Sequence, residues 1–335
     1  MKRALVVLLQ FAIVVHAETP VATSPNDARK TAAATSIRIE KTDGSLVASG
    51  VLVTPDGYFL TKASEVPKVG ELAYRLPDNT IAKAREVRRN SRFDLVLGQV
   101  LNVKGLTPVK WSESKSLALG QWLLAPEQGG RETRLGVMSA RRREIKGGSA
   151  AIGIRMDEKN TADGVKIIGI AEDSPAAAAG LKADDVLVSV AGNAIKEYKA
   201  VHNMILNREP GEELEIQYRR GDKVSKCTVR LASRNRVLSN WTGEDYANGG
   251  ISIRTDNFQE IIQHDIPLGP ADMGGPLLNL LGQAVGINIA RVDRVTTFAL
   301  PMEIFWPSVQ QWIAEDRNPP KAEPAASVAK PASTP

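Results

Sequence analysis

Cysteine is almost absent from this chain, which has a single one, Cys227, among 335 residues. No internal disulfide can therefore form, and stability must come from buried apolar side chains. Hydrophobic residues make up 43% of the chain, which is typical of a globular protein with true cores. Cys227 alternates with Val229 and Leu231, so we expect a buried strand thiol.

A strong excess of charge is also missing. The chain has 43 basic and 38 acidic residues, and leaving out Lys2 and Arg3, which lie in a segment expected to be removed, leaves 41 basic ones. A balance this even argues against nucleic-acid binding. The sequence has no Cys/His cluster of the zinc type and no glycine-rich phosphate loop, so we expect no metal and no cofactor.

Long hydrophobic runs are lacking as well. The apolar run from Ala4 to Val15 is about 12 residues long, short of the roughly 18 needed to span a bilayer. It follows two basic residues and ends in Val15-His16-Ala17, a small-residue cleavage pattern. We therefore expect a signal peptide over residues 1–17 and an exported protein, periplasmic or secreted, with no membrane span after cleavage. An uncleaved anchor is the alternative.

The remaining chain divides by pattern. Residues 18–33 are rich in Pro, Thr, Ser and Ala and are expected to be a linker, and residues 317–335 a disordered Pro/Ala-rich tail. Short β-prone runs separated by turns predict a mainly β protein built on barrels. We expect barrel segments over residues 34–146 and 235–316, with a separate module over 147–234.

Three separated segments carry a family resemblance. The run SGVLVTPDGYFLTKASEV (49–66), the run NSRFDLVLGQV (90–100) and the loop GPADMGGPLLN (269–279) occur in the order found in the HtrA (Deg) branch of the trypsin-like serine proteases. The resemblance implies a trypsin-like double β-barrel. It also aligns the catalytic His, Asp and Ser of the family with Ser64, Asp94 and Met273, and an oxyanion-hole Gly with Ala271.

Acyl transfer by this fold needs a hydroxyl nucleophile and an imidazole base. A thioether at position 273 has no proton to lose, and Ser64 cannot accept one near neutral pH. Two other histidines remain after His16. His264 precedes the loop and is expected to be a satisfied strand histidine rather than a relocated base, and His202 lies in the separate module.

The run DSPAAAAGLKADDVLVSVAGNAI (173–195) resembles a PDZ domain, placed within the second barrel instead of after it. The resemblance implies a groove that takes an extended peptide or a protein C-terminus, with its carboxylate bound by backbone N–H groups. The candidate peptide-binding residues are Ile152, Gly153 and Ile154, together with His202 if it faces the groove.

We conclude from the sequence that the chain is an exported HtrA-like pseudoprotease, not an enzyme, that binds peptides through its PDZ domain. A regulatory, scaffolding or chaperone-like role in protein quality control is expected, and a homo-oligomer is left open. One alternative is an active serine-type endopeptidase with a rearranged site. Another is a purely structural scaffold with a closed groove.

Overall fold

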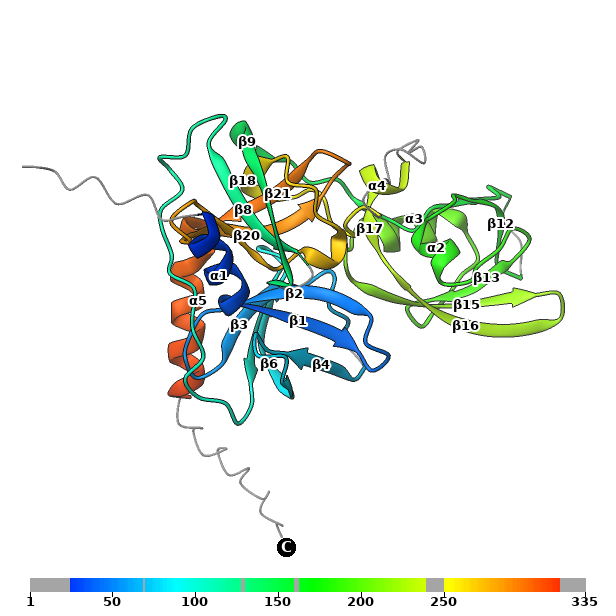
Figure 1. Cartoon of the computed structure of the whole chain (residues 1–335). Coiled ribbons are helices and arrows are strands. Elements are labelled where there is room, and N and C mark those ends of the chain that lie inside the picture. Colours follow the sequence, from blue (N-terminus) through cyan, green and yellow to red (C-terminus); the bar gives the residue numbers. More distant parts are fainter. Residues whose placement is uncertain (1–24, 69, 128–129, 160–162, 239–249, 320–335) are drawn as a thin grey trace, which may run out of the picture.

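A computed structural model describes residues 25–68, 70–127, 130–159, 163–238 and 250–319. The expected signal peptide and most of the expected tail lie outside the described residues. The architecture is mainly β, with two barrel-like sheets side by side and a third sheet to one side of them (Figure 1). The mainly β class expected from the sequence is confirmed.

The first sheet has seven strands in the order β5-β4-β1-β2-β3-β7-β6. Its strands are β1 (Ser36–Lys41), β2 (Leu46–Leu52), β3 (Tyr58–Lys62), β4 (Leu72–Arg75), β5 (Ile81–Ala82), β6 (Ala84–Asn90) and β7 (Leu95–Val100). Neighbouring strands pair antiparallel throughout, as expected for short strands joined by tight turns.

The second sheet closes into a barrel, in the order β18-β21-β20-β19-β8-β9. Its strands are β8 (Trp122–Glu127), β9 (Glu132–Ile145), β18 (Phe258–His264), β19 (Pro276–Leu278), β20 (Ala284–Arg291) and β21 (Thr297–Pro301). Strands β9 and β18 are neighbours in space although more than a hundred residues separate them, so the barrel is interrupted in sequence and continuous in structure.

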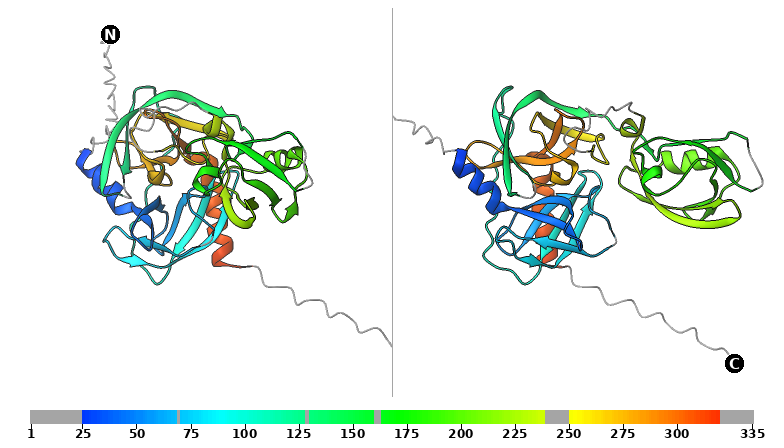
Figure 2. Two further views of the ribbon diagram at one scale, coloured as in Figure 1. Left: turned by 90° about the vertical axis from the view of Figure 1, so that its right-hand side faces the viewer. Right: turned by 45° about the vertical axis from the view of Figure 1, so that its right-hand side comes forward.

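The chain between β9 and β18 forms a separate module, called here the inserted module (residues 150–233). Its strands are β10 (Ala150–Ala151), β11 (Ile154–Met156), β12 (Val165–Ile170), β13 (Val186–Val190), β14 (Asn193–Ala194), β15 (Glu213–Arg220), β16 (Lys223–Arg230) and β17 (Ala232–Ser233), and its helices are α2 (Pro175–Ala178) and α3 (Tyr198–Leu206). The module stands to one side of the barrels in Figure 1 and in the right-hand view of Figure 2. Strands β10 and β17 pair, so the entry and exit of the module lie together, which makes insertion into a barrel feasible.

Two further helices pack on the barrels. Helix α1 (Pro25–Thr35) covers the second barrel at β8 and β9, and helix α5 (Met302–Arg317) runs along both sheets (Figure 1). The expected linker over residues 18–33 therefore needs correction, because its second half is helical and buries Ala28 and Ala32. Alanine is a strong helix former, and its small side chain lets the helix approach the barrel closely.

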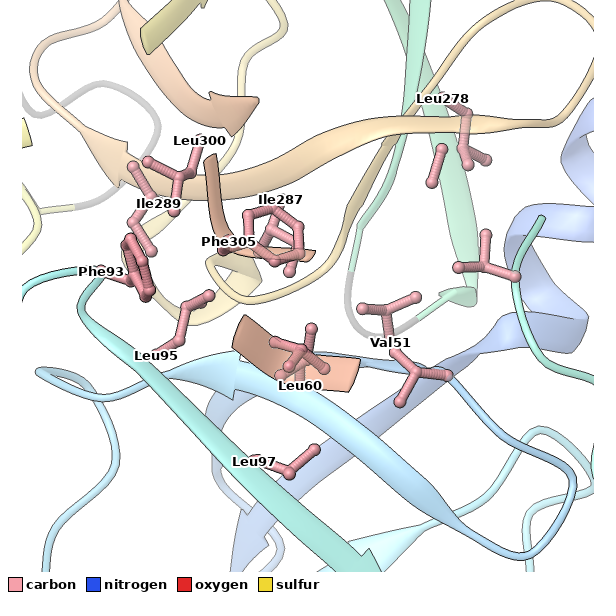
Figure 3. Packing of buried hydrophobic residues seen from close by; sticks show 14 of the residues in the cluster. Val51, Leu60, Phe93, Leu95, Leu97, Leu278, Ile287, Ile289, Leu300 and Phe305 are labelled. Atoms are coloured by element: carbon pink, nitrogen blue, oxygen red, sulfur yellow. The ribbon is translucent and has the colours of Figure 1, made fainter. Parts of the chain in front are cut away.

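One core joins the two sheets (Figure 3). Val51, Leu60, Leu95 and Leu97 of the first sheet meet Leu278, Ile287, Ile289 and Leu300 of the second, with Phe305 of α5 between them. Full burial of each such side chain stabilises the fold by roughly 1.5 to 3 kcal/mol. The inserted module has a separate core of its own, built on Ile167, Leu187, Val201, Ile216 and Val229 among others.

Candidate functional site

Two of the three positions aligned with the triad lie together at the edge of the first sheet. The Asp94 carboxylate accepts hydrogen bonds from the Ser64 backbone N–H at 2.7 Å and from the Ser64 hydroxyl at 2.8 Å. Asp94 is buried, and burial raises its pKa, although Lys62, Arg254 and the hydrogen bonds from Ser64 act in the opposite direction. The pair is thus a buried hydroxyl–carboxylate contact.

Met273, the third position, is fully buried in the second barrel among Leu123, Ile266 and Leu277. It follows a short 3-10 helix, η2 (Pro270–Asp272), and its N–H donates to the carbonyl of Pro270 at 3.1 Å. The Met273 thioether therefore points into the barrel. The Met273 N–H is hydrogen-bonded within the loop. Ala271 lies within the same 3-10 helix, at ordinary negative φ.

His264 lies beneath this loop rather than beside Asp94. Its Nε2 is 2.9 Å from Oδ1 of Asn288, and its Nδ1 is 3.3 Å from the Ile266 backbone N–H. Burial lowers the pKa of His264 to about 4, so the ring is neutral at physiological pH. In the neutral tautomer that satisfies both contacts, Nε2–H donates to Asn288 and Nδ1 accepts from Ile266.

The inserted module covers the Ser64–Asp94 pair. A cavity of about 70 Å³ is lined on one side by Ser64 and Asp94 and on the other by the loop 209–212, which follows α3. Gly211 approaches so closely that a β-carbon there would lie 2.8 Å from the Ser64 Cβ. A polypeptide substrate could reach Ser64 only if this loop moved away.

Arg230, on strand β16 of the module, joins the module to the segment that carries Ser64. Its guanidinium donates to the carbonyls of Val66 at 2.9 Å, Glu65 at 3.1 Å and Ala63 at 3.4 Å. These carbonyls belong to the segment on both sides of Ser64. Burial lowers the pKa of Arg230, which its neighbour Glu65 partly offsets.

The candidate peptide-binding residues also come together. Ile152, Gly153, Ile154 and His202 line one cavity of about 220 Å³ between strand β11 and helix α3. Strand β11 is the last in its sheet, so no described strand pairs with its outer edge. Among the described residues, no acceptor takes up the N–H of Ile152 or Gly153.

Sequence reasoning missed the residues that connect the module to the barrels. Gly211 lies in a Pro-Gly pair that signals only the end of a helix, and Arg230 ends a strand of alternating residues. It also missed helix α4 (Arg234–Leu238), which lines the groove. Within the described part of the chain, no group of three or more His, Cys, Asp or Glu side chains is arranged to hold a metal ion.

Comparison with known proteins fits this architecture. Residues 48–179 match the family model of the trypsin-like peptidase domain, and residues 150–231 match that of the PDZ domain. The two matches overlap over residues 150–179, which belong to the inserted module in the structure.

The relatives share one description, "probable periplasmic serine endoprotease DegP-like". The protein of Pseudomonas savastanoi pv. phaseolicola is 34% identical over 77 residues, which cover 23% of this chain and 16% of the relative. That of Rickettsia conorii is 19% identical over 307 residues, covering 66% of this chain and 60% of the relative. That of Bartonella henselae is 23% identical over 280 residues, covering 60% and 56%.

The two domain matches and the DegP-like relatives support an HtrA-family protein. In these three alignments the chain covers less than two thirds of the relative's length. A solved structure described as HtrA-type protease AlgW with decapeptide is also similar, at 14% identity, covering 63% of this chain and 99% of that one. Its TM-score of 0.31 is too low to support the fold by itself.

These findings confirm the expected family and the trypsin-like fold with a PDZ domain. The relatives are named as periplasmic, which is consistent with the expected export. In the described residues, no helix combines the length and apolarity needed to cross a membrane.

The expectation that the chain is not an enzyme needs correction. It rested on the residues at positions 64 and 273, whereas the trypsin-like peptidase match and the serine endoprotease relatives point to a family of serine endopeptidases. Replacement of two motif residues changes the local chemistry but does not establish a loss of activity, because other groups can supply acid and base functions.

Proposed function

We propose that this HtrA protein binds extended peptides or protein C-termini in the groove of its PDZ domain, in a regulatory, scaffolding or chaperone-like role outside the cytoplasm. The observation that carries the proposal is the unpaired outer edge of β11, which faces α3 across the cavity of about 220 Å³. An extended peptide can add to such an edge as a further strand.

The side chains around the groove support this proposal. Ile152, Ile154, Ile205 and Leu206 give it apolar walls, which suit an apolar side chain of the ligand. The N–H groups of Ile152 and Gly153 are available for its backbone or carboxylate oxygens. In this proposal the PDZ domain spans residues 147–234 and the barrel segments span 34–146 and 235–316.

Binding is tested on the full chain by fluorescence anisotropy with labelled ten-residue peptides that end in Ala, Val, Leu, Phe or Asp. We expect peptides with apolar ends to bind, and the variant Leu206→Asp to weaken binding by about tenfold or more, because it places a carboxylate in the groove. The matched control is Ile168→Asp, at a 43% exposed position on β12 outside this cavity.

If no peptide binds to the unmodified protein, the proposal fails and the scaffold with a closed groove takes its place. Hydrolysis is measured separately with casein and fluorogenic peptides. Cleavage that survives repurification and disappears in Asp94→Ala would identify a rearranged peptidase site in this chain. The binding proposal holds for either outcome of that assay.

A further inference from the structure

The first sheet curves around a cavity that the proposed function does not use. Its volume is about 160 Å³, and strands β1, β3, β4, β6 and β7 all contribute to its wall. Ile39 and Phe59 in this wall are buried. Lys68, Gly70 and Glu86, which also line the cavity, are exposed and mark its mouth. None of its lining residues belongs to the peptide groove, so the cavity is a separate compartment that opens to solvent.

Two aromatic rings form one side of this cavity. The ring centroids of Phe59 and Tyr74 lie 5.5 Å apart at an interplanar angle of 51°. The Phe59 ring lies directly on Gly98, where a β-carbon would collide with it. The other apolar side chains of the wall are Ile39, Val66, Leu72, Ala84 and Val96. Because an apolar cavity of about 150 Å³ can hold one benzene ring, the size and lining suit a single aromatic ring.

The charged side chains at the mouth leave one cation unpaired. Arg85 donates to Asp316, and Glu86 accepts from Arg89. Lys68, by contrast, forms no ion pair and no side-chain hydrogen bond within the part of the chain that the structure describes. An exposed ammonium group at the rim of an apolar cavity attracts an anionic group of a ligand whose apolar part lies inside.

Tyr74 supplies a second polar group near the mouth. Its hydroxyl has no hydrogen-bond partner among the described residues. Burial, together with the nearby Glu86, raises the pKa of Tyr74, so the hydroxyl remains protonated at physiological pH and can donate. A phenol and an ammonium group can both bind the oxygens of one carboxylate. The mouth therefore suits a carboxylate, and the wall suits a ring.

We propose that the first sheet binds a small aromatic monocarboxylic acid in this cavity, with the ring against Phe59 and the carboxylate between Tyr74 and Lys68. The ring leaves water for an apolar wall, whereas the carboxylate stays at the solvent-exposed mouth, where its desolvation costs little. This site is independent of the proposed peptide groove. A neutral analogue keeps the contacts of the ring and loses the attraction of Lys68, and a carboxylate without a ring has nothing to bury.

The test uses the full chain and ligand-observed NMR titrations with three probes, namely phenylacetate, its neutral analogue phenylacetamide, and acetate. We expect phenylacetate to bind with a dissociation constant on the order of 1 mM, as suits a ligand of this size. Phenylacetamide should bind about three- to tenfold more weakly, because it lacks the charge. Acetate should show no binding up to about 20 mM.

Two pairs of variants locate the ring and the carboxylate. Ala84→Leu fills the cavity and should weaken phenylacetate binding by about tenfold or more, whereas the same change at Ala73, on β4 but outside the cavity, should leave it unchanged. Lys68→Gln should reduce the preference for the acid over the amide to about twofold or less. Lys83→Gln, at an exposed position outside the cavity, should keep the full preference.

Three further measurements complete the design. Lys68 also lines the cavity at Ser64, so Ala84→Leu, which does not touch that cavity, decides where the ring lies. Leu72→Phe is a second filling variant, for use if Ala84→Leu does not fold, and thermal unfolding verifies that each variant is folded. Leu206→Asp in the peptide groove should bind phenylacetate as the unmodified protein does.

Undiminished binding of phenylacetate to the folded filling variants would overturn this inference, because the ring would then lie elsewhere. Loss of binding in Leu206→Asp alone would also overturn it and place the acid in the peptide groove. An acid preference that persists in Lys68→Gln would refute the contact with Lys68. If phenylacetate does not bind the unmodified protein at all, this inference fails while the proposed peptide binding, measured with separate ligands, is unaffected.

Discussion

Gly211 of the PDZ domain touches Ser64 of the first sheet, and the contact leaves no room for a β-carbon, which would lie 2.8 Å from the Ser64 Cβ. Gly211 also has a φ of 93°, in the region that favours glycine. This single contact joins the PDZ domain to the position that the family resemblance aligns with the catalytic histidine.

We predict that Gly211→Ala loosens the PDZ domain from the barrel. The strain of a positive φ costs about 1 kcal/mol, and the clash with Ser64 adds to it. Gly192→Ala is the matched control, because its φ is 79° but no atom lies near the added carbon. Gly211→Ala should speed limited proteolysis of the loop 209–212 and lower the free energy of unfolding in urea more than Gly192→Ala does. Equal effects of the two variants would show that Gly211 does not pack against Ser64.

Arg230→Ala should destabilise the same interface. The variant removes the donor of the Glu65 carbonyl, whereas Arg89 still donates to the carbonyls of Ala63 and Val66, so the expected loss in the free energy of unfolding is about 1 to 3 kcal/mol. Lys226→Ala on the same strand removes an exposed charge paired with Glu215 and should cost under about 1 kcal/mol. Urea unfolding curves of the two variants check this, and similar losses would rule out a special role for Arg230.

His264 should make the protein sensitive to mild acid. Burial lowers its folded pKa to about 4 from an ordinary value near 6.5, so the unfolded chain takes up the proton first as the pH falls. The contribution of neutral His264 to the free energy of unfolding is fully present above about pH 6.5. As the pH falls from about 6.5 to 4 this contribution is lost, up to roughly 3 kcal/mol.

His264→Gln should remove this part of the pH dependence, whereas the control His202→Gln, at an exposed position, should retain it. The measurement is the free energy of unfolding in urea from pH 4 to 8. A wild-type curve that is as flat as the His264→Gln curve over this range would show that the imidazole is not buried in its neutral form.

Met273→Ser should lower the free energy of unfolding by about 3 kcal/mol or more. The change leaves a cavity in the second barrel and buries a hydroxyl, whereas Met273→Leu keeps the volume and should cost less than about 1.5 kcal/mol. Thermal unfolding compares the two. If Met273→Ser is as stable as Met273→Leu, the side chain at this position faces solvent rather than the barrel interior.

The segment 147–234 should fold when expressed alone, because its core is separate from the core of the barrels and its two ends pair through β10 and β17. The expected result is a single cooperative transition in urea. A broad, non-cooperative change would show that the PDZ domain depends on the contacts that Gly211 and Arg230 make with the barrel.

The sequence by itself determined the elements whose signals are local. The alternation of Cys227 and Val229 indicated strand β16, and the motif order placed Asp94 and Met273 within their segments. The place of the PDZ-like run, between the two expected barrel segments, also indicated an insertion.

Only the tertiary structure decided which of these segments meet. Nothing local shows that Gly211 lies on Ser64, that Arg230 reaches the carbonyls around it, or that Val237 of α4 lies against Gly153. Likewise, α1 has no strong apolar periodicity and becomes a helix against the barrel surface that buries Ala28. These contacts join residues distant in the chain, and periodicity and propensity report only on neighbours along it, so they arise from packing of the completed sheets.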